Sequence, residues 1–326
     1  MLTSGVGSAF LRHRVFVATP PGADTIEAYL RQTVAPNLRV GMYLGPPRAN
    51  RKPVLQLLTP AGRLAGFAKI SINPLTGRLC RAEWASLARL SCAGLVHVTV
   101  PEVKHYGQWR GLDVLVLSAL PVWRPAHPLP AGLLTDAMEE VAAVDGLQQA
   151  RLGTAPFFRL LHDRLSAADQ GPPRAALLTA LSAVAERAAS EVLTFGAWHG
   201  DWTASNMAHT GGGLLVWDWE RFAPGVPLGF DALHHWLQAE VITGRHGPLA
   251  AAVACPALAV SLLAPWGIDA RQARLTAVLY MAELATRYLA DQQSRAGARH
   301  GAPETWLIPA IANETARLCS RPGVPA

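Results

Sequence analysis

The pattern of apolar and polar positions predicts strands in the first third of the chain and helices in the rest. Short apolar runs in the first third are separated by a proline-rich loop and by a Thr-Pro-Ala-Gly turn at 59–62, a pattern typical of an antiparallel meander. Within this region, the leucines of segment 78–92 recur at helical spacing and predict one helix. The predicted strands are 39–45, 54–58, 64–71, 103–109 and 113–120.

Segment 121–130 holds four prolines and indicates a hinge between two lobes. We therefore expect an α+β molecule with one lobe at 1–120 and a second, mostly helical lobe at 121–326. A non-helical island at 198–227 interrupts the second lobe, and functional loops are expected at such interruptions. The predicted helices are 131–151, 156–168, 173–194, 231–244, 249–264, 269–293 and 303–319.

The island carries a set of oxygen donors in a fixed order. It opens with His-Gly-Asp-Trp-Thr-Ala-Ser-Asn, which places Asp201 and Asn206 five residues apart, and Asp218 follows at the end of an apolar strand at 214–219. Hard divalent cations such as Mg²⁺ prefer carboxylate and carboxamide oxygens. A single Asp of this kind is more often a capping residue in a turn, but the ordered set favours a metal and phosphate site.

A second pair of charges lies in the first third. Lys69 falls in the strand at 64–71, and Glu83 falls on the apolar stripe of the helix at 78–92. An acid within an apolar stripe needs a cation to offset the cost of its burial. We therefore predict that Lys69 and Glu83 form a buried ion pair, the alternative being two unrelated exposed charges.

These residues together resemble a known family. A Lys on the third strand, a Glu on the next helix, a His-Gly-Asp-x-x-x-x-Asn loop and a later Asp follow the order of the protein-kinase-like fold. The His-Gly-Asp form is similar to that of the aminoglycoside phosphotransferase and choline kinase superfamily. The run at 216–220, Val-Trp-Asp-Trp-Glu, and the helix start at 228–233 resemble that family's metal-binding strand end and the helix whose Asp braces the catalytic loop.

The resemblance implies a bilobal protein-kinase-like fold that transfers a phosphoryl group from ATP, or another nucleoside triphosphate, with Mg²⁺. Asp201 would accept or orient the proton of the acceptor hydroxyl. Asn206 and Asp218 would hold Mg²⁺ on the phosphates, and Lys69, held by Glu83, would contact the inner phosphates. Such chemistry needs positioning and charge neutralisation more than covalent help.

The purine would be bound at the hinge by backbone groups, the carbonyl of Ser118 and the amide of Leu120. The chain lacks the Gly-rich loop of protein kinases, and the loop between the first two predicted strands offers Arg48, Asn50 and Arg51 to cover the phosphates. The sequence does not choose among these three.

Charge is unevenly distributed along the chain. Residues 1–121 carry a net charge of +9 and residues 122–326 a net charge of −3, and only three of the 29 cationic residues are lysines. The basic first lobe suits a nucleoside triphosphate. A nucleic-acid-binding module is disfavoured because the cations are scattered arginines without a recognisable motif.

We therefore predict an ATP-dependent kinase acting on a hydroxyl of a small molecule: a sugar, an antibiotic or an amino alcohol. The weak net charge of the second lobe favours a neutral or singly charged acceptor over a polycationic aminoglycoside. It would lie in a cleft bordered by Asp201 and segment 231–293, with an aromatic contribution from Trp202 or Trp219.

Two rivals share the fold. A protein kinase is disfavoured because Asp231 follows Asp218 by only 13 positions, which leaves no room for an activation segment. A catalytically silent nucleotide-binding scaffold would be expected to lose Lys69, Asp201, Asn206 or Asp218, and none is lost.

The remaining expectations concern location. Arg12 and Arg14 fall where a signal peptide needs its apolar core, and the four scattered cysteines predict reduced, buried thiols in a cytoplasmic protein. The uncharged segment 247–268 is rich in alanine and contains Pro256 and Pro265, so we expect a buried helical hairpin and no membrane span.

Overall fold

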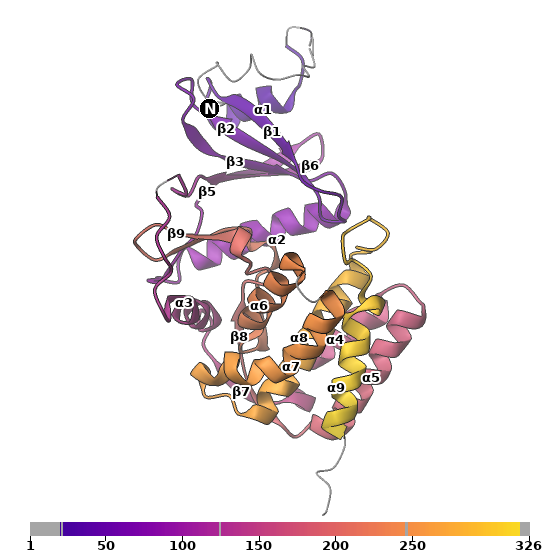
Figure 1. Cartoon of the computed structure of the whole chain (residues 1–326). Coiled ribbons are helices and arrows are strands. Elements are labelled where there is room, and N and C mark those ends of the chain that lie inside the picture. Colours follow the sequence, from indigo (N-terminus) through magenta and orange to yellow (C-terminus); the bar gives the residue numbers. More distant parts are fainter. Residues whose placement is uncertain (1–19, 21, 124, 245–246, 320–326) are drawn as a thin grey trace, which may run out of the picture.

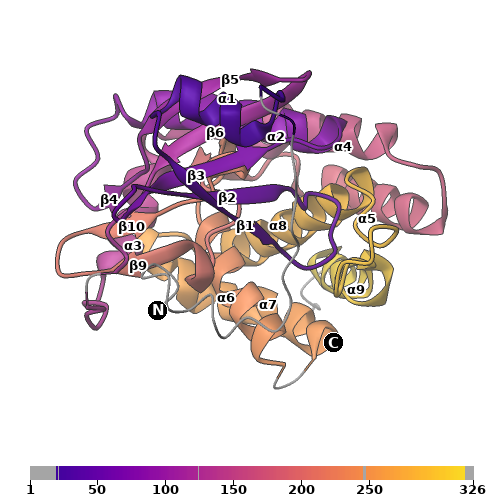
Figure 2. The same cartoon turned by 90° about the horizontal axis from the view of Figure 1, so that it is seen from above.

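The predicted strands of the first third form one antiparallel sheet in the order β1-β2-β3-β6-β5. The computed structural model describes residues 20, 22–123, 125–244 and 247–319. The sheet forms the upper lobe in Figure 1, and Figure 2 shows β1 and β5 at its two edges. The strands are β1 (Arg39–Leu44), β2 (Pro53–Leu58), β3 (Leu64–Ile70), β5 (Val103–Trp109) and β6 (Leu112–Ser118).

Helix α2 (Pro74–Leu90) lies between this sheet and the second lobe (Figure 1). It begins four residues before the predicted start because Asn73 caps it and Pro74 occupies its first turn, where a proline costs no hydrogen bond. A shorter helix that we did not predict, α1 (Ile26–Thr33), buries Leu30 against the other face of the sheet.

The second lobe is mostly helical, as predicted. Its central helix is α8, buried over most of its length and in contact with α4, α5, α6, α7 and α9. Figure 1 shows these helices gathered below the sheet. The helices are α3 (Leu133–Ala142), α4 (Pro156–Ala167), α5 (Pro172–Ala188), α6 (Phe230–Thr243), α7 (Pro248–Leu263), α8 (Ala270–Ala290) and α9 (Leu307–Cys319).

Two small sheets interrupt the helices and hold the island. The predictions of helix at 131–151 and 173–194 were wrong at their C-terminal ends, which form β7 (Gln148–Arg151) and β8 (Val192–Trp198). These strands pair with each other, and β11 (Ala223–Pro227) pairs with the other edge of β8. Such long-range pairing overrides local helical preference.

The second small sheet joins the island to the first third of the chain. β10 (Leu214–Val216) pairs antiparallel with β9 (Met207–His209) and parallel with β4 (Val98–Thr99). The predicted strand at 214–219 therefore ends two residues before Asp218. Because β10 ends at Val216, Asp218 lies in the turn that follows the strand, and the end of the strand sets its position.

The prediction of a hairpin at 247–268 was wrong. The chain forms a single helix, α7, which continues through Pro256 into a 3₁₀ turn, η6 (Ala264–Trp266). By length and composition alone Pro248–Trp266 could cross a membrane, but one face of the helix, including Ala252, Cys255 and Leu263, is buried against its neighbours in the lobe.

The cysteines follow the prediction only in part. Cys80 and Cys255 are buried free thiols, whereas Cys92 is exposed just after α2, so the prediction was wrong there. The side chain of Cys319 lies outside the described residues.

Candidate active site

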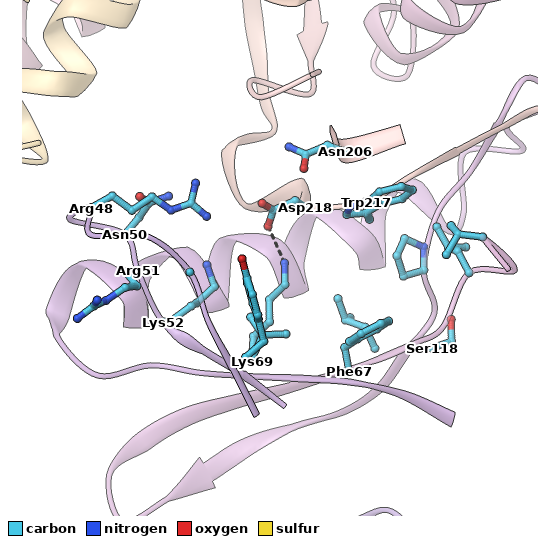
Figure 3. A pocket seen from close by; sticks show the side chains of 17 residues that line it. Arg48, Asn50, Arg51, Lys52, Phe67, Lys69, Ser118, Asn206, Trp217 and Asp218 are labelled. Carbon is cyan, nitrogen blue, oxygen red and sulfur yellow. Dashed lines mark hydrogen bonds and ion pairs between the residues drawn. The ribbon is translucent and has the colours of Figure 1, made fainter. Parts of the chain in front are cut away.

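A cavity of about 400 Å³, here called the interlobe cavity, lies between the sheet and the second lobe (Figure 3). Its mouth is basic and its far end, toward the hinge, is apolar. It is lined by Tyr43, Gly45, Arg48, Asn50, Arg51, Lys52, Val54, Phe67, Lys69, Pro101, Leu117, Ser118, Leu120, Val122, Asn206, Trp217 and Asp218.

The predicted contact between Lys69 and Glu83 is present. Lys69 Nζ lies 2.6 Å from both carboxylate oxygens of Glu83, and it also lies 2.6 Å from Oδ1 of Asp218 across the cavity (Figure 3). Burial opposes the charge of Lys69, but Asp218 and Glu83 outweigh that cost and raise its pKa above the ordinary value. Lys69 therefore remains a cation in the floor of the cavity.

Asp218 has an unusual backbone conformation. Its φ of 73° lies in the left-handed region, which a non-glycine residue adopts only at a cost of roughly 1–2 kcal/mol. The turn carries the chain from β10 into the 3₁₀ segment η5 (Trp219–Arg221) and leaves the carboxylate facing Lys69. Although burial favours the neutral acid, Lys69 and Lys52 lower the pKa of Asp218, so it is ionised.

A second lysine, which we did not predict, enters the same cavity from the start of β2. Lys52 is buried and forms an ion pair with Glu220, whose other carboxylate oxygen accepts a 3.1 Å hydrogen bond from Asn50. Oxygens of Glu83, Asp218 and Glu220 lie within 4.8 Å of one another, a spacing that could hold a metal ion. The ammonium groups of Lys52 and Lys69 offset two of the three negative charges of this cluster.

The predicted metal ligands Asn206 and Asp218 line the same cavity. Asn206, in the 3₁₀ turn η4 (Ala204–Asn206), donates through Nδ2 to the backbone oxygen of Asp201 at 2.9 Å and to Oδ2 of Asp201 at 3.1 Å. Its carboxamide oxygen is thereby turned toward Asp218 (Figure 3). A carboxamide oxygen facing an ionised carboxylate fits the oxygen donors that Mg²⁺ requires.

Asp201 is held from a second side by a histidine that sequence reasoning did not single out. Nε2 of His234, on α6, lies 3.1 Å from Oδ1 of Asp201, and its Nδ1 lies 3.0 Å from the hydroxyl of Tyr280. Burial lowers the pKa of His234, so the ring is neutral, donates from Nε2 and accepts from Tyr280. Despite burial, the hydrogen bond from His234 lowers the pKa of Asp201 and keeps it ionised.

The backbone of the loop at 199–206, the proposed catalytic loop, is braced by Asp231 at the start of α6, as the resemblance implied. Its carboxylate accepts the amides of His199 at 2.7 Å and Gly200 at 3.1 Å. Gly200 has a φ of 82°, and a Cβ there would lie 2.3 Å from the carbonyl oxygen of Arg221. Only glycine fits between the loop and η5.

The predicted hinge residues line the apolar end of the interlobe cavity. The amide and hydroxyl groups of Ser118 are both occupied by the backbone of Glu102, at 2.8 and 2.9 Å. The amide of Leu120 has no hydrogen-bond partner among the described residues. The sequence did not decide which residue of the loop between β1 and β2 would cover the phosphates. All three candidates, Arg48, Asn50 and Arg51, line the cavity, and Asn50 is hydrogen-bonded to Glu220.

A second cavity of about 390 Å³, here called the C-lobe cavity, opens on the other side of Asp201. The prediction of an aromatic wall was wrong: Trp202 and Trp219 are fully buried in a core with Val216 and Leu115, because their rings pack around His199 and each other. The cavity is lined by Pro46, Pro47, Arg48, Asn50, Asp201, Arg221, His234, Gln238, Val241, Ile242, Leu284, Arg287, Tyr288, Gln293, Ala298, Arg299, His300 and Gly301.

Comparison with solved structures shows which known proteins share the fold of this chain. The sequence matches no model of a known protein family and no curated protein. Among solved structures, a ternary complex of aminoglycoside phosphotransferase APH(4)-Ia with ADP and hygromycin B superposes with a TM-score of 0.56 at 14% identity, covering 92% of this chain and 99% of that one. The GDP and kanamycin complex of APH(2")-IIia superposes with a TM-score of 0.53 at 13% identity, covering 89% and 98%.

The chain has the protein-kinase-like fold of the aminoglycoside phosphotransferases. This likeness confirms the predicted fold class, an antiparallel sheet lobe joined to a helical lobe. Within that fold, sequence reasoning missed Lys52, Glu220, His234 and Arg287. The rarity of lysine in this chain was a signal for Lys52, but nothing in the local pattern of the other three distinguishes them from surface or core residues.

Proposed function

We propose that this protein is a small-molecule kinase that transfers the γ-phosphoryl group of ATP or GTP to a hydroxyl group. One observation carries the proposal: the interlobe cavity and the C-lobe cavity meet at Asp201 and Asn206. Asn206 lines the first cavity, Asp201 lines the second, and the two side chains are hydrogen-bonded at 3.1 Å. A phosphoryl group and an acceptor hydroxyl can therefore meet there.

Each cavity suits one substrate. The apolar end near Leu117 and Leu120 suits a purine, since the Leu120 amide has no hydrogen-bond partner in the described part of the chain, and the lysines and arginines at the other end suit its phosphates. Lys69 would contact the inner phosphates, and Asn206 and Asp218 would hold Mg²⁺. That ion, when bound, neutralises charge on the transferred group.

Asp201 would act on the acceptor. It is ionised, half-buried and fixed from two sides, so it can orient the acceptor hydroxyl and take its proton as the new phosphate ester bond forms and the bond to the leaving diphosphate breaks. Nucleotides and an antibiotic acceptor in the structural neighbours support the same pairing of substrates. We further propose that residues 1–120 bind nucleotide, that 121–326 bind the acceptor, and that the enzyme works in the cytoplasm.

The substitution Asp201→Asn tests the proposal. It should lower turnover by about 10²–10⁴-fold, because the carboxamide cannot accept the proton, while Mg-nucleotide affinity stays within a few-fold. Release of nucleoside diphosphate from ATP and from GTP would be measured against a panel of hydroxylated metabolites and antibiotics. Mg-nucleotide binding without Asp201-dependent turnover of any acceptor would favour the alternative, a catalytically silent scaffold.

A further inference from the structure

The wall of the C-lobe cavity is strongly basic. Asp201 is its sole acid, whereas Arg48, Arg221, Arg287 and Arg299 contribute guanidinium groups. All 23 acidic residues of the chain lie in the described part, so no acid outside it can alter this balance. The net charge of the whole lobe, on which our acceptor prediction was based, conceals this local excess of positive charge.

Arg287 is the most informative of these cations because it is buried next to the catalytic loop. Its side chain is only 10% exposed, and it donates a 2.6 Å hydrogen bond to the carbonyl of Gly200. The nearest carboxylate, Glu283, is 4.0 Å away and already binds both terminal nitrogens of Arg164. The guanidinium also stacks on the ring of Trp198, 4.9 Å from its centroid, but no carboxylate of the described residues lies within hydrogen-bond distance of it, so an anion in the cavity would complete its charge pairing.

The neighbouring arginines add to the excess. Arg221 is buried close to Arg287 and is neutralised by Asp291 at 2.5 Å. At the rim, Arg48 and Arg299 are exposed and form no ion pair with any described residue. Arg299 belongs to the loop between α8 and α9, which reaches the sheet lobe through a 3.2 Å hydrogen bond from the Ala49 amide to Gln293 (Figure 1).

We infer that the acceptor is a hydroxylated small molecule carrying an anionic group, a carboxylate or a phosphate. Its anionic group binds Arg287 and Arg299 while its hydroxyl meets Asp201. This inference rests on the proposed kinase function and specifies its substrate class. An acceptor with several amines would instead face the guanidinium groups of Arg287 and Arg299 with Asp201 as the one lining carboxylate, an unfavourable arrangement.

Acceptors matched in carbon skeleton test the inference. Purified full-length protein with Mg-ATP or Mg-GTP would be offered glycerol, glycerate and glycerol 3-phosphate, then glucose, gluconate, glucose 1-phosphate and glucosamine, with kanamycin as the polycation. We expect the anionic members to have the lower KM, by about tenfold, and that KM to rise with ionic strength. The carboxylate and phosphate arms show which anion is preferred.

Two arginines of the same loop provide a matched pair of variants. Arg299→Gln should raise KM for the anionic acceptor about tenfold and leave the nucleotide KM unchanged, because the lost charge faces only the C-lobe cavity. Arg295→Gln removes an exposed arginine that pairs with Asp169 and does not line the cavity, so it should change neither constant. Equal effects of the two variants would overturn the assignment of Arg299.

Binding measurements cover the case in which no panel member is phosphorylated. Protein saturated with Mg²⁺ and a non-hydrolysable ATP analogue would be titrated calorimetrically with glycerol 3-phosphate and with gluconate. Binding that Arg299→Gln weakens supports the inference. Absence of binding in the millimolar range, together with no turnover, overturns it.

The outcomes separate this inference from the function on which it rests. If a neutral or polycationic acceptor is preferred and its turnover depends on Asp201, the kinase proposal stands and the anionic acceptor is wrong. If Mg-nucleotide does not bind at all, the kinase proposal itself fails.

Discussion

Lys69 stands between two acids from different lobes, Glu83 on α2 and Asp218 after β10. Each of the three charges would be costly to bury alone, and the nearby Lys52–Glu220 ion pair adds one further charge of each sign to the cluster. At the scale of single residues, the site is therefore a balance of buried charges in which no member can be removed without affecting the others.

The first residue-scale prediction concerns this coupling. Glu83→Leu leaves Lys69 with Asp218, whereas Lys69→Met leaves two acids uncompensated, so Lys69→Met should be the more destabilising, by roughly 3–5 kcal/mol. The double variant should be more stable than the sum of the two losses implies. Urea unfolding of all four proteins in a double-mutant cycle checks this. Additive losses would mean that the Lys69–Glu83 contact contributes no coupling energy.

The second residue-scale prediction concerns metal. Asp218→Ala should weaken nucleotide binding much more in the presence of Mg²⁺ than in EDTA, because the lost carboxylate is a proposed ligand of the ion. Nucleotide titrations under both conditions measure the difference. Asp169→Ala, at an exposed acid of the helical lobe, is the control and should change neither affinity. An equal loss with and without Mg²⁺ would make Asp218 a purely structural residue.

At the scale of elements, the catalytic loop is fixed by its neighbours and not by its own hydrogen bonds alone. Asp231 at the start of α6 accepts two of its amides, and Arg287 on α8 donates to the carbonyl of Gly200. The loop also lies so close to η5 that Gly200 touches the carbonyl of Arg221. Three elements from distant parts of the chain thus determine where Asp201 points.

The element-scale prediction compares two glycines with left-handed backbones. Gly111 has a φ of 76° with open space around it, and Gly200 has a φ of 82° with Arg221 in the way. Gly111→Ala should cost about 1–2 kcal/mol of stability and leave turnover unchanged. Gly200→Ala should cost more and also reduce kcat, because η5 and the catalytic loop must separate. Thermal unfolding and kcat of both variants are the measurements, and indistinguishable variants would contradict the close contact.

At the scale of the whole molecule, contacts join the two lobes both around the two cavities and away from them, where Arg89 pairs with Asp145 and Glu140 accepts the amides of residues 96–98. Lys69 with Asp218, Lys52 and Asn50 with Glu220, and Ala49 with Gln293 connect the sheet lobe to the helical lobe. His199 is a fully buried titratable ring of the site. It accepts the amide of Asp201 through Nδ1 at 3.0 Å and donates from Nε2 to Trp217, so it must be neutral.

The whole-molecule prediction follows from this histidine. Burial lowers the pKa of His199 to about 4 from an ordinary value of 6.5. Between these values the unfolded chain binds more protons than the folded one, so the His199 contribution to stability grows as the pH rises from 4 to 6.5. A shift of this size corresponds to at most about 3 kcal/mol. Chemical unfolding of the natural protein and His199→Asn across this range should show a shallower slope in the variant, and equal slopes would contradict a neutral, buried ring.

The sequence by itself determined the fold class and pointed to five of the polar residues that the structure brings together between the lobes. The period of the apolar positions separated a sheet lobe from a helical one, and the spacing of Lys69, Glu83, Asp201, Asn206 and Asp218 was informative because each is a polar residue set in an apolar or loop context. Each of these signals can be read from residues that are close together in the sequence. The Lys69–Glu83 contact could be predicted because strand and helix follow each other directly.

Only the tertiary structure decided what surrounds those residues. His234, Arg287 and Lys52 reach the site from elements far apart in the sequence, and no local pattern shows that they converge. The same holds for Trp202 and Trp219: a position beside a catalytic residue suggested a wall of the acceptor cavity, but the rings turn into the core, where their large apolar area is removed from water. Net charge along the chain likewise concealed a basic cavity, because acids and arginines that are mixed in sequence are separated in space.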